Sequence, residues 1–273
     1  MRRAKIIGFI SIKGGVGKTT AVANLGFVLA NQFKKKVLVV DGNFSGPNLA
    51  LHLGFTKPEK TLHDVLNQGL SLQKAVYEHS SGLNILPGSL FGDKVDSSKF
   101  HQYIASLRSH YDLILIDSSP ALNQEMLATI MAADELFVLT TPDYVTLAST
   151  LHAIKVARQK RTYISGIIIN KVRGKRFELD LDKVQDATKV PVVSVLDDDE
   201  SVMKALAKGE PITSIKGDNN IAVEYKKLAA ALIGERYVDN RIKTRIKTFF
   251  NKKLSQDEIN RAIVMVSHYW YGN

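Results

Sequence analysis

The chain of 273 residues contains no cysteine and no apolar run long enough to cross a membrane. Without cysteine it has neither a disulfide framework nor a thiolate-ligated metal centre, which excludes cysteine-bound iron–sulfur clusters. A membrane span needs about 20 consecutive apolar residues, and every apolar run here is much shorter. The basic start at Arg2 and Arg3 is followed by too short an apolar run for a signal peptide. We therefore expect a cytoplasmic protein.

Positive charge is in excess, and it is unevenly distributed. The formal net charge is +10, and residues 236–253 contain seven basic residues and one acidic residue. This short segment therefore contributes most of the net charge, while the rest of the chain is only mildly basic. Such a distribution indicates one local basic segment rather than a protein that is basic over its whole surface and binds nucleic acid with it.

Apolar runs alternate with segments of helical spacing along most of the chain. Hydrophobic residues make up 45% of the sequence, enough for a sizeable core. This alternation predicts an α/β domain with a mostly parallel, doubly wound sheet and helices on both faces. We place that domain at residues 1–235 and a basic amphipathic helical tail at 236–273. Strands are expected within 6–10, 37–40, 83–88, 113–117, 136–140, 163–170 and 190–196.

A glycine-rich stretch, SIKGGVGKTT at residues 11–20, separates the first expected strand from a segment with helical apolar spacing. In this context backbone N–H groups and a helix N-terminus bind phosphate. Lys18 adds a full positive charge, and the hydroxyl of Thr19 is a suitable Mg²⁺ ligand. The stretch therefore predicts a nucleoside triphosphate site. Its expected nucleotide-binding residues are Gly14, Gly15, Val16, Gly17, Lys18, Thr19 and Thr20.

The loop departs from the ordinary G-x-x-x-x-G-K-[ST] pattern in two ways. Ile12 stands where the first glycine is expected, and Lys13 adds a second lysine. With these features the loop resembles the deviant Walker A loop of the MinD/ParA family of P-loop ATPases, and MinD-like proteins most of all. The resemblance implies an ATPase that binds Mg-ATP and forms a homodimer when ATP is bound. It also implies that Lys13 reaches the nucleotide of the other subunit, so Lys13 and Lys18 would both serve catalysis.

Two aspartates follow apolar runs that are expected to be strands. Asp41 and Asp117 would meet at the carboxyl edge of the sheet, where open α/β sheets bind ligands. The family resemblance assigns Asp117 to Mg²⁺ and Asp41 to Mg²⁺ or to the attacking water. For Asp41, a purely structural Asx-turn is the alternative.

Two asparagines complete the expected site. Asn43 stands where the family has a second acid. An asparagine can orient the attacking water but cannot accept its proton at neutral pH, so we expect slow hydrolysis. Asn170, at the end of a later strand, resembles the residue that contacts adenine in related nucleotidases. An ordinary loop-start asparagine is the equal alternative at that position.

The segment 241–253 combines an apolar helical face with basic residues on the other faces. One interpretation is a helical hairpin, formed with the helix that follows, which docks its apolar faces on the domain or on itself. Another is a helix lying on an anionic membrane, peripheral to the inner face of the cell membrane, as in MinD-type relatives. A less favoured one is a DNA phosphate-binding patch, as in ParA-type relatives. The apolar face consists of Ile242, Ile246, Phe249 and Phe250.

A second tail helix is expected directly after this segment. Residues 255–258, Ser-Gln-Asp-Glu, have the pattern of a capping box that opens a helix. Helical spacing places four apolar residues on one face of it: Ile259, Ile263, Val266 and Trp270.

Three function classes follow from these features. The favoured one is a MinD/ParA-like ATPase switch that positions or partitions an unidentified cargo and is controlled by an unidentified activator protein. The second is an ATP-gated scaffold with little hydrolysis, which Asn43 leaves open. The third is a metabolic P-loop ligase related to dethiobiotin synthetase, for which the sequence shows no convergent catalytic set.

Overall fold

The computed structural model describes residues 3–215, 219–239, 241 and 256–271. An eight-stranded sheet runs through the molecule in the order β3-β4-β2-β5-β1-β6-β7-β8. Neighbouring strands are parallel except for β3, which runs antiparallel to β4 at one edge. The α/β class expected from the alternating pattern is confirmed. The strands are β1 (Lys5–Ile10), β2 (Val37–Gly42), β3 (Tyr77–Glu78), β4 (Asn84–Leu86), β5 (Leu113–Ser118), β6 (Glu135–Thr140), β7 (Tyr163–Val172) and β8 (Val192–Asp197).

Helices and short 3-10 turns connect the strands. Gly69 separates α2 from α3, and the expected second tail helix is present as α11. The helices are α1 (Lys18–Asn31), α2 (Leu62–Gln68), α3 (Leu72–Ala75), α4 (Phe100–Ser106), α5 (Gln124–Ala132), α6 (Tyr144–Gln159), α7 (Leu181–Thr188), α8 (Glu200–Leu206), α9 (Asn220–Leu232) and α11 (Gln256–Tyr271), and the 3-10 turns are η1 (Leu51–Leu53), η2 (Ser97–Lys99), η3 (Leu107–Ser109) and η4 (Ile212–Ser214).

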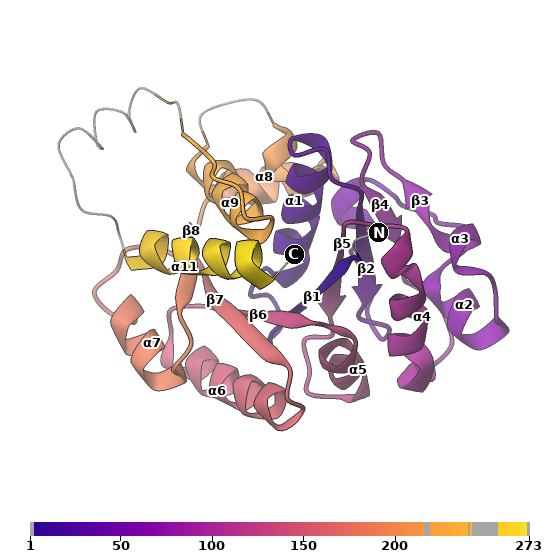
Figure 1. The fold of residues 1–273 in the computed structure, drawn as a ribbon, viewed down its shortest axis with the longest axis horizontal. Coiled ribbons are helices and arrows are strands. Elements are labelled where there is room, and N and C mark those ends of the chain that lie inside the picture. The colour runs from indigo at the N-terminus through magenta and orange to yellow at the C-terminus, as the bar shows by residue number, and fades with distance from the viewer. Residues whose placement is uncertain (1–2, 216–218, 240, 242–255, 272–273) are drawn as a thin grey trace.

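Helices cover both faces of the sheet (Figure 1), because successive strand side chains point to opposite faces. In β1, Ile7 and Phe9 belong to the apolar layer shared with α1 and α9. Ile6 belongs to the opposite layer with α4, and Ile10 to the layer with α6. The central strands β2 and β5 are buried along their whole length. Burial on both faces explains why these strands read as continuous apolar runs in the sequence.

The tail helix α11 returns to the sheet and packs against β8 and α9 (Figure 1). Its buried residues include Asn260, Arg261 and Val264. By contrast, Ile259 is 40% exposed and Ile263 is 61% exposed. The apolar face expected from helical spacing is therefore not the face that docks at these positions, because buried polar side chains find partners on the sheet and on α9.

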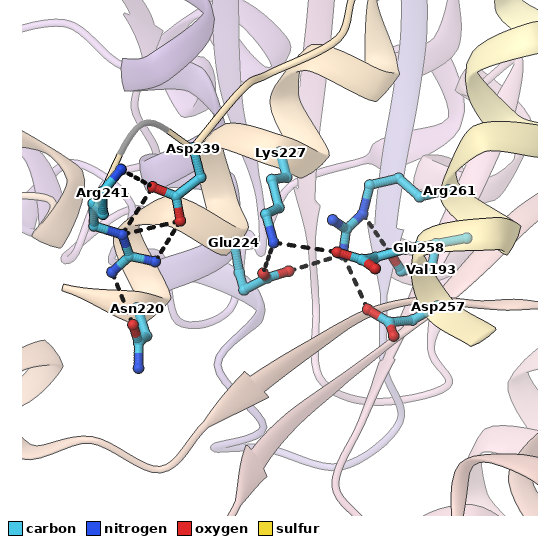
Figure 2. Close-up of polar contacts among 9 residues, drawn as sticks. All are labelled: Val193, Asn220, Glu224, Lys227, Asp239, Arg241, Asp257, Glu258 and Arg261. Carbon is cyan, nitrogen blue, oxygen red and sulfur yellow. Dashed lines mark hydrogen bonds and ion pairs between the residues drawn. The ribbon is translucent and has the colours of Figure 1, made fainter. Parts of the chain in front are cut away.

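Hydrogen bonds and ion pairs hold α11 in place (Figure 2). Arg261 donates from Nε to the backbone carbonyl of Val193 at 2.9 Å. Its Nη2 donates to Glu224 of α9 at 2.8 Å and to Asp257 at 3.2 Å. Asn260 likewise donates to the carbonyl of Val192 at 2.8 Å. These bonds satisfy polar groups of the edge strand β8 that would otherwise lie buried without partners.

A second arginine, near the start of the tail, anchors the chain to α9. Arg241 pairs with Asp239 at 2.7 Å and donates to the side-chain oxygen of Asn220 at 2.8 Å (Figure 2). Apart from Arg241, the expected basic helix at 241–253 lies outside the described residues. Among the residues that the structure does describe, no helix combines the length and apolar character needed to cross a bilayer.

The docking of α11 gives a stability prediction. Arg261→Ala should lower the free energy of unfolding by roughly 2–4 kcal/mol, because it leaves Glu224 and Asp257 partly buried beside an unsatisfied carbonyl. Arg173→Ala is the matched control. Its ion pair with Asp198 is largely exposed, so the loss should stay below about 1 kcal/mol. Urea unfolding of both variants measures the difference, and equal losses would contradict the docking role of Arg261.

Candidate functional site

The glycine-rich loop joins the carboxyl end of β1 to the first turn of α1. Its last glycine, Gly17, is the N-cap of α1 and has φ of 93°, in the left-handed region that favours glycine. A Cβ atom at this position would lie 2.1 Å from Nδ2 of Asn170. Glycine is therefore required here both by the backbone and by the neighbouring strand. None of the first residues of α1 is acidic, so the helix N-terminus keeps its positive potential for an anion.

A cleft of about 440 Å³ opens beside this loop at the carboxyl edge of the sheet. One end is formed by the loop with Asn43 and Pro120, and this end suits phosphates. The other end is formed by the ends of β7 and β8 with parts of α8 and α9. Its lining residues are Asn170, Lys171, Asp197, Asp198, Asp199, Val202, Met203, Leu206, Ile221 and Tyr225. The glycine-rich loop at one end and apolar side chains such as Val202, Leu206 and Ile221 at the other suit a nucleotide with its base at the far end.

Lys18 and Asp117 form the buried centre of the phosphate end. Lys18 is 6% exposed and its Nζ lies 2.9 Å from Oδ1 of Asp117, which is fully buried. Lys18 also donates to the carbonyl of Ser118. A buried cation and a buried carboxylate are tolerated only when they are paired in this way.

The same carboxylate fits a divalent cation. Oδ2 of Asp117 is buried and accepts no hydrogen bond from the described residues. A vacant carboxylate oxygen beside a phosphate site is a typical Mg²⁺ ligand, and the Thr19 hydroxyl lies on the same cleft. Within the described part of the chain no group of three or more acidic or histidine side chains gathers around a metal. The remaining ligands would therefore come from phosphate and water, as is usual for Mg²⁺.

Asp41 is held by the loop that follows it. It lies opposite Asp117 on the neighbouring strand and is 1% exposed. Its Oδ1 accepts from the backbone N–H of Asn43 at 3.2 Å, and its Oδ2 accepts from that of Leu49 at 2.9 Å. Burial and then the charge of Asp117 raise the pKa of Asp41 to about 7. The carboxylate thus organises the loop, and its predicted contact with Mg²⁺ or water stays a prediction.

Asn43 lies on the cleft wall with 9% of its surface exposed. Its Nδ2 donates to the carbonyl of Gly46 at 2.5 Å, inside the same loop. This bond orients the side-chain oxygen, since the amide plane is set by the donor. The role of Asn43 in orienting the attacking water stays a prediction.

Lys13 and Asn170 both contact neighbouring segments of the chain beside the nucleotide cleft. The Lys13 Nζ is 2.9 Å from Oγ1 of Thr146 and 3.8 Å from Asp143, and the Lys13 side chain is 45% exposed. Nδ2 of Asn170 donates to the carbonyl of Val16 at 2.7 Å. Both residues line the cleft. Their predicted contacts, with a second subunit and with adenine, stay predictions.

The structure also shows cleft residues that the sequence analysis missed. Ile221 and Tyr225 come from α9, which begins about two hundred residues after the phosphate loop. Asn48 and His52 come from the segment after β2. Apolar and aromatic residues of a helix resemble core residues in a sequence, so no local signal separates a base-pocket wall from ordinary packing.

Comparisons with known proteins agree with this geometry. A family model described as an AAA domain matches residues 4–165. An uncharacterized ATP-binding protein of Methanocaldococcus jannaschii is 32% identical over 249 residues, covering 90% of this chain and 94% of that protein.

Two solved structures are similar over most of the chain. The cell division ATPase MinD of Pyrococcus furiosus has a TM-score of 0.78 and 31% identity, covering 83% of this chain and 97% of that one. The septum site-determining protein MinD of Pyrococcus horikoshii, complexed with Mg-ADP, has a TM-score of 0.78 and 32% identity, covering 83% and 94%.

The phosphate end of the cleft gives a binding prediction. Lys18→Ala should weaken binding of Mg-ATP roughly 100-fold or more, because the phosphates lose a buried, charge-assisted donor. Calorimetric titration measures the affinity, with circular dichroism to show that the variant is folded. Lys171→Ala is the control, since Lys171 lines the same cleft but is exposed. Equal affinities for the two variants would sink the assignment of the phosphate site.

Proposed function

Because the chain belongs to the MinD/ParA family of P-loop ATPases, we propose that it is an ATP-dependent dimerisation switch that positions or partitions a cargo in the cell. The observation that carries this proposal is the arrangement of two lysines around one loop. Lys18 is buried against Asp117 inside the cleft, whereas Lys13 is half-exposed at its rim. In this proposal Lys18 binds the chain's own nucleotide, and the half-exposed Lys13 contacts the nucleotide of a second subunit.

The nucleotide in this proposal is ATP with Mg²⁺. Support comes from the Mg-ADP bound to the similar Pyrococcus horikoshii protein and from the unpartnered Oδ2 of Asp117. Asp117 and the hydroxyl of Thr19 would hold the ion, with Asp41 beside them. When bound, Mg²⁺ supplies charge neutralisation on the phosphates. Lys18 and the loop amides bind and orient those phosphates.

Hydrolysis in this proposal is slow. Asn43 lines the cleft and in this proposal orients the attacking water, but an amide does not accept a proton at neutral pH. Both oxygens of Asp41 are engaged by backbone N–H groups, so that carboxylate is also poorly placed as a base. The same observations favour a second candidate, an ATP-gated scaffold with almost no turnover.

The tail would direct the switch to a surface. Residues 236–253 are strongly basic, and the described residues around them are anchored by Arg241 and by α11. We assign to this segment a contact with an anionic membrane at the inner face of the cell membrane, with DNA as the alternative polyanion. Two copies in a dimer would strengthen a contact that one copy makes weakly.

Lys13 tests the dimerisation part of the proposal. Lys13→Ala should bind Mg-ATP within about threefold of wild type, because its proposed contact lies in the other subunit. Light scattering should show no ATP-dependent doubling of mass for this variant, in contrast to the doubling that we expect for wild type. Lys171→Ala, which removes another exposed lysine that lines the cleft, should still dimerise. Wild-type dimerisation by the Lys13 variant would refute the role proposed for this lysine.

Asn43 tests the hydrolysis part. Asn43→Asp should raise the single-turnover rate with Mg-ATP by about tenfold or more, because it supplies a carboxylate near the attacking water. Asn48→Asp adds the same charge elsewhere on the cleft wall and should have little effect.

Asp41→Ala should remove residual activity. A fast wild-type rate that survives Asp41→Ala would show that water is activated elsewhere, and no turnover in any variant would favour the scaffold.

A further inference from the structure

A buried histidine connects two loops at the carboxyl edge of the sheet, next to the cleft. His63 belongs to α2, is 4% exposed, and lines neither the cleft nor the glycine-rich loop. The backbone N–H of Ser89 donates to its Nδ1 at 3.0 Å. Its Nε2 lies 3.1 Å from the carbonyl oxygen of Phe44. Since an N–H group can only donate, Nδ1 must be the acceptor, and Nε2 carries the proton and donates to Phe44.

The packing around the ring allows little freedom. The Phe44 ring meets the His63 ring edge to face at 6.2 Å and meets Phe100 at 5.4 Å. A Cβ atom at Gly92 would lie 2.4 Å from Cδ2 of His63. The ring therefore occupies a slot between the segment after β2 and the segment after β4, and glycine is required at position 92 to admit it. A side chain fixed at both nitrogens and on both sides holds its neighbours in register.

The residue held most directly by this contact precedes Phe44 in the chain. Asn43 is adjacent to the anchored carbonyl, lines the cleft, and is bonded to Asp41 and to Gly46 within the same loop. On the other side of the loop, Ser45 donates to Glu125 at the start of α5. His63 and Glu125 thus hold residues 43–46 from two separate helices.

We propose that His63 is a positioning residue for ATP turnover: the neutral ring, bridging Ser89 and Phe44, sets the place of Asn43 at the phosphate end of the cleft. The inference rests on the proposed ATPase function and adds to it a residue that supports turnover without contacting the nucleotide. The side chain acts through the loop backbone, so it should affect the rate of turnover and leave ATP binding almost unchanged.

The charge state of His63 gives the proposal a specific signature. Burial lowers the pKa of His63 below 6.5, and the hydrogen bond to Phe44 and the nearby carboxyls of Asp64 and Glu125 oppose that shift. The other groups that contact the ring, namely the Phe44 ring and the backbones of Ser89 and Gly92, are uncharged. Above its pKa the ring is neutral and both bonds are present. As the pH falls through that pKa, Nδ1 gains a proton that faces the Ser89 N–H, so the bridge is lost.

Two amide substitutions separate the two hydrogen bonds. In His63→Gln the amide nitrogen can replace Nε2 and keep the bond to Phe44, without a group that titrates. In His63→Asn the shorter side chain can reach Ser89 but not Phe44. We expect His63→Asn to lower kcat roughly tenfold with KM for ATP unchanged within about twofold. We expect His63→Gln to retain most of kcat. The acid limb of the pH–rate profile is the fall in kcat as the pH is lowered, and His63→Gln should lose the part of this limb that lies below pH 6.5 in wild type.

His79→Gln is the matched control. Burial also lowers the pKa of His79, but this residue lies after β3 and its Nδ1 bonds only locally to Ser81 among the described contacts. It should keep both the wild-type kcat and the wild-type acid limb. If His63→Asn turns over ATP like wild type, or if His63→Gln keeps the full acid limb, the proposal is wrong.

A second measurement is independent of turnover. Hydrogen–deuterium exchange of residues 43–50 should be faster in His63→Asn than in wild type and His63→Gln, because only that variant releases the Phe44 carbonyl. A wild-type protein that hydrolyses no ATP would refute the ATPase function while leaving this exchange test to decide the anchor. Equal exchange in wild type and His63→Asn would show that His63 does not anchor the loop. If His63→Asn does not fold, the comparison of the acid limbs of His63→Gln and His79→Gln tests the proposal instead.

Discussion

The buried pair of Lys18 and Asp117 is the contact on which the site depends. Both side chains are almost completely removed from water, and neither charge would be tolerated alone at that depth. The pair joins the start of α1 to the end of β5, a strand directly beside β1 in the sheet. Because the chain must place these two ends together, the glycine-rich loop and the acidic strand end cannot drift apart. The cleft, the phosphate end and the vacant oxygen of Asp117 all follow from that juxtaposition.

Around this centre the loops are organised by side chains that contact backbone rather than ligand. Asp41 receives two N–H bonds from the loop after β2, and His63 receives one from Ser89 while donating to Phe44. Such bonds cost little to maintain because both partners are already removed from water. They hold the loop that carries Asn43, a polar residue that lines the cleft. The position of the loop at the cleft is therefore set by side chains, such as Asp41 and His63, that bond to its backbone.

The helix α9 links the cleft to the C-terminal part of the chain. Ile221 and Tyr225 line the far end of the cleft, whereas Asn220 and Glu224 in the same two turns bind Arg241 and Arg261 (Figure 2). The interface with α11 is rich in hydrogen bonds and ion pairs, with Val264 as its buried apolar contact. Helical spacing in the sequence groups Ile259 and Ile263 on one apolar face, but both are exposed. The buried face of α11 instead carries Asn260 and Arg261, because these side chains bond to polar groups of β8 and α9.

Local pattern was sufficient for the α/β class, for the positions of most strands and for the phosphate loop. Buried parallel strands are continuous apolar runs, and a glycine-rich turn before a helix has few uses besides phosphate binding. Tertiary structure alone added Ile221 and Tyr225 to the cleft, and it alone decided which carboxylate oxygen is vacant and which face of α11 is buried. Those properties depend on the order of strands in the sheet, and that order brings residue 18 to residue 117 and residue 63 to residue 89. Contacts between residues so far apart in the chain leave no periodicity or spacing in the sequence from which they could be inferred.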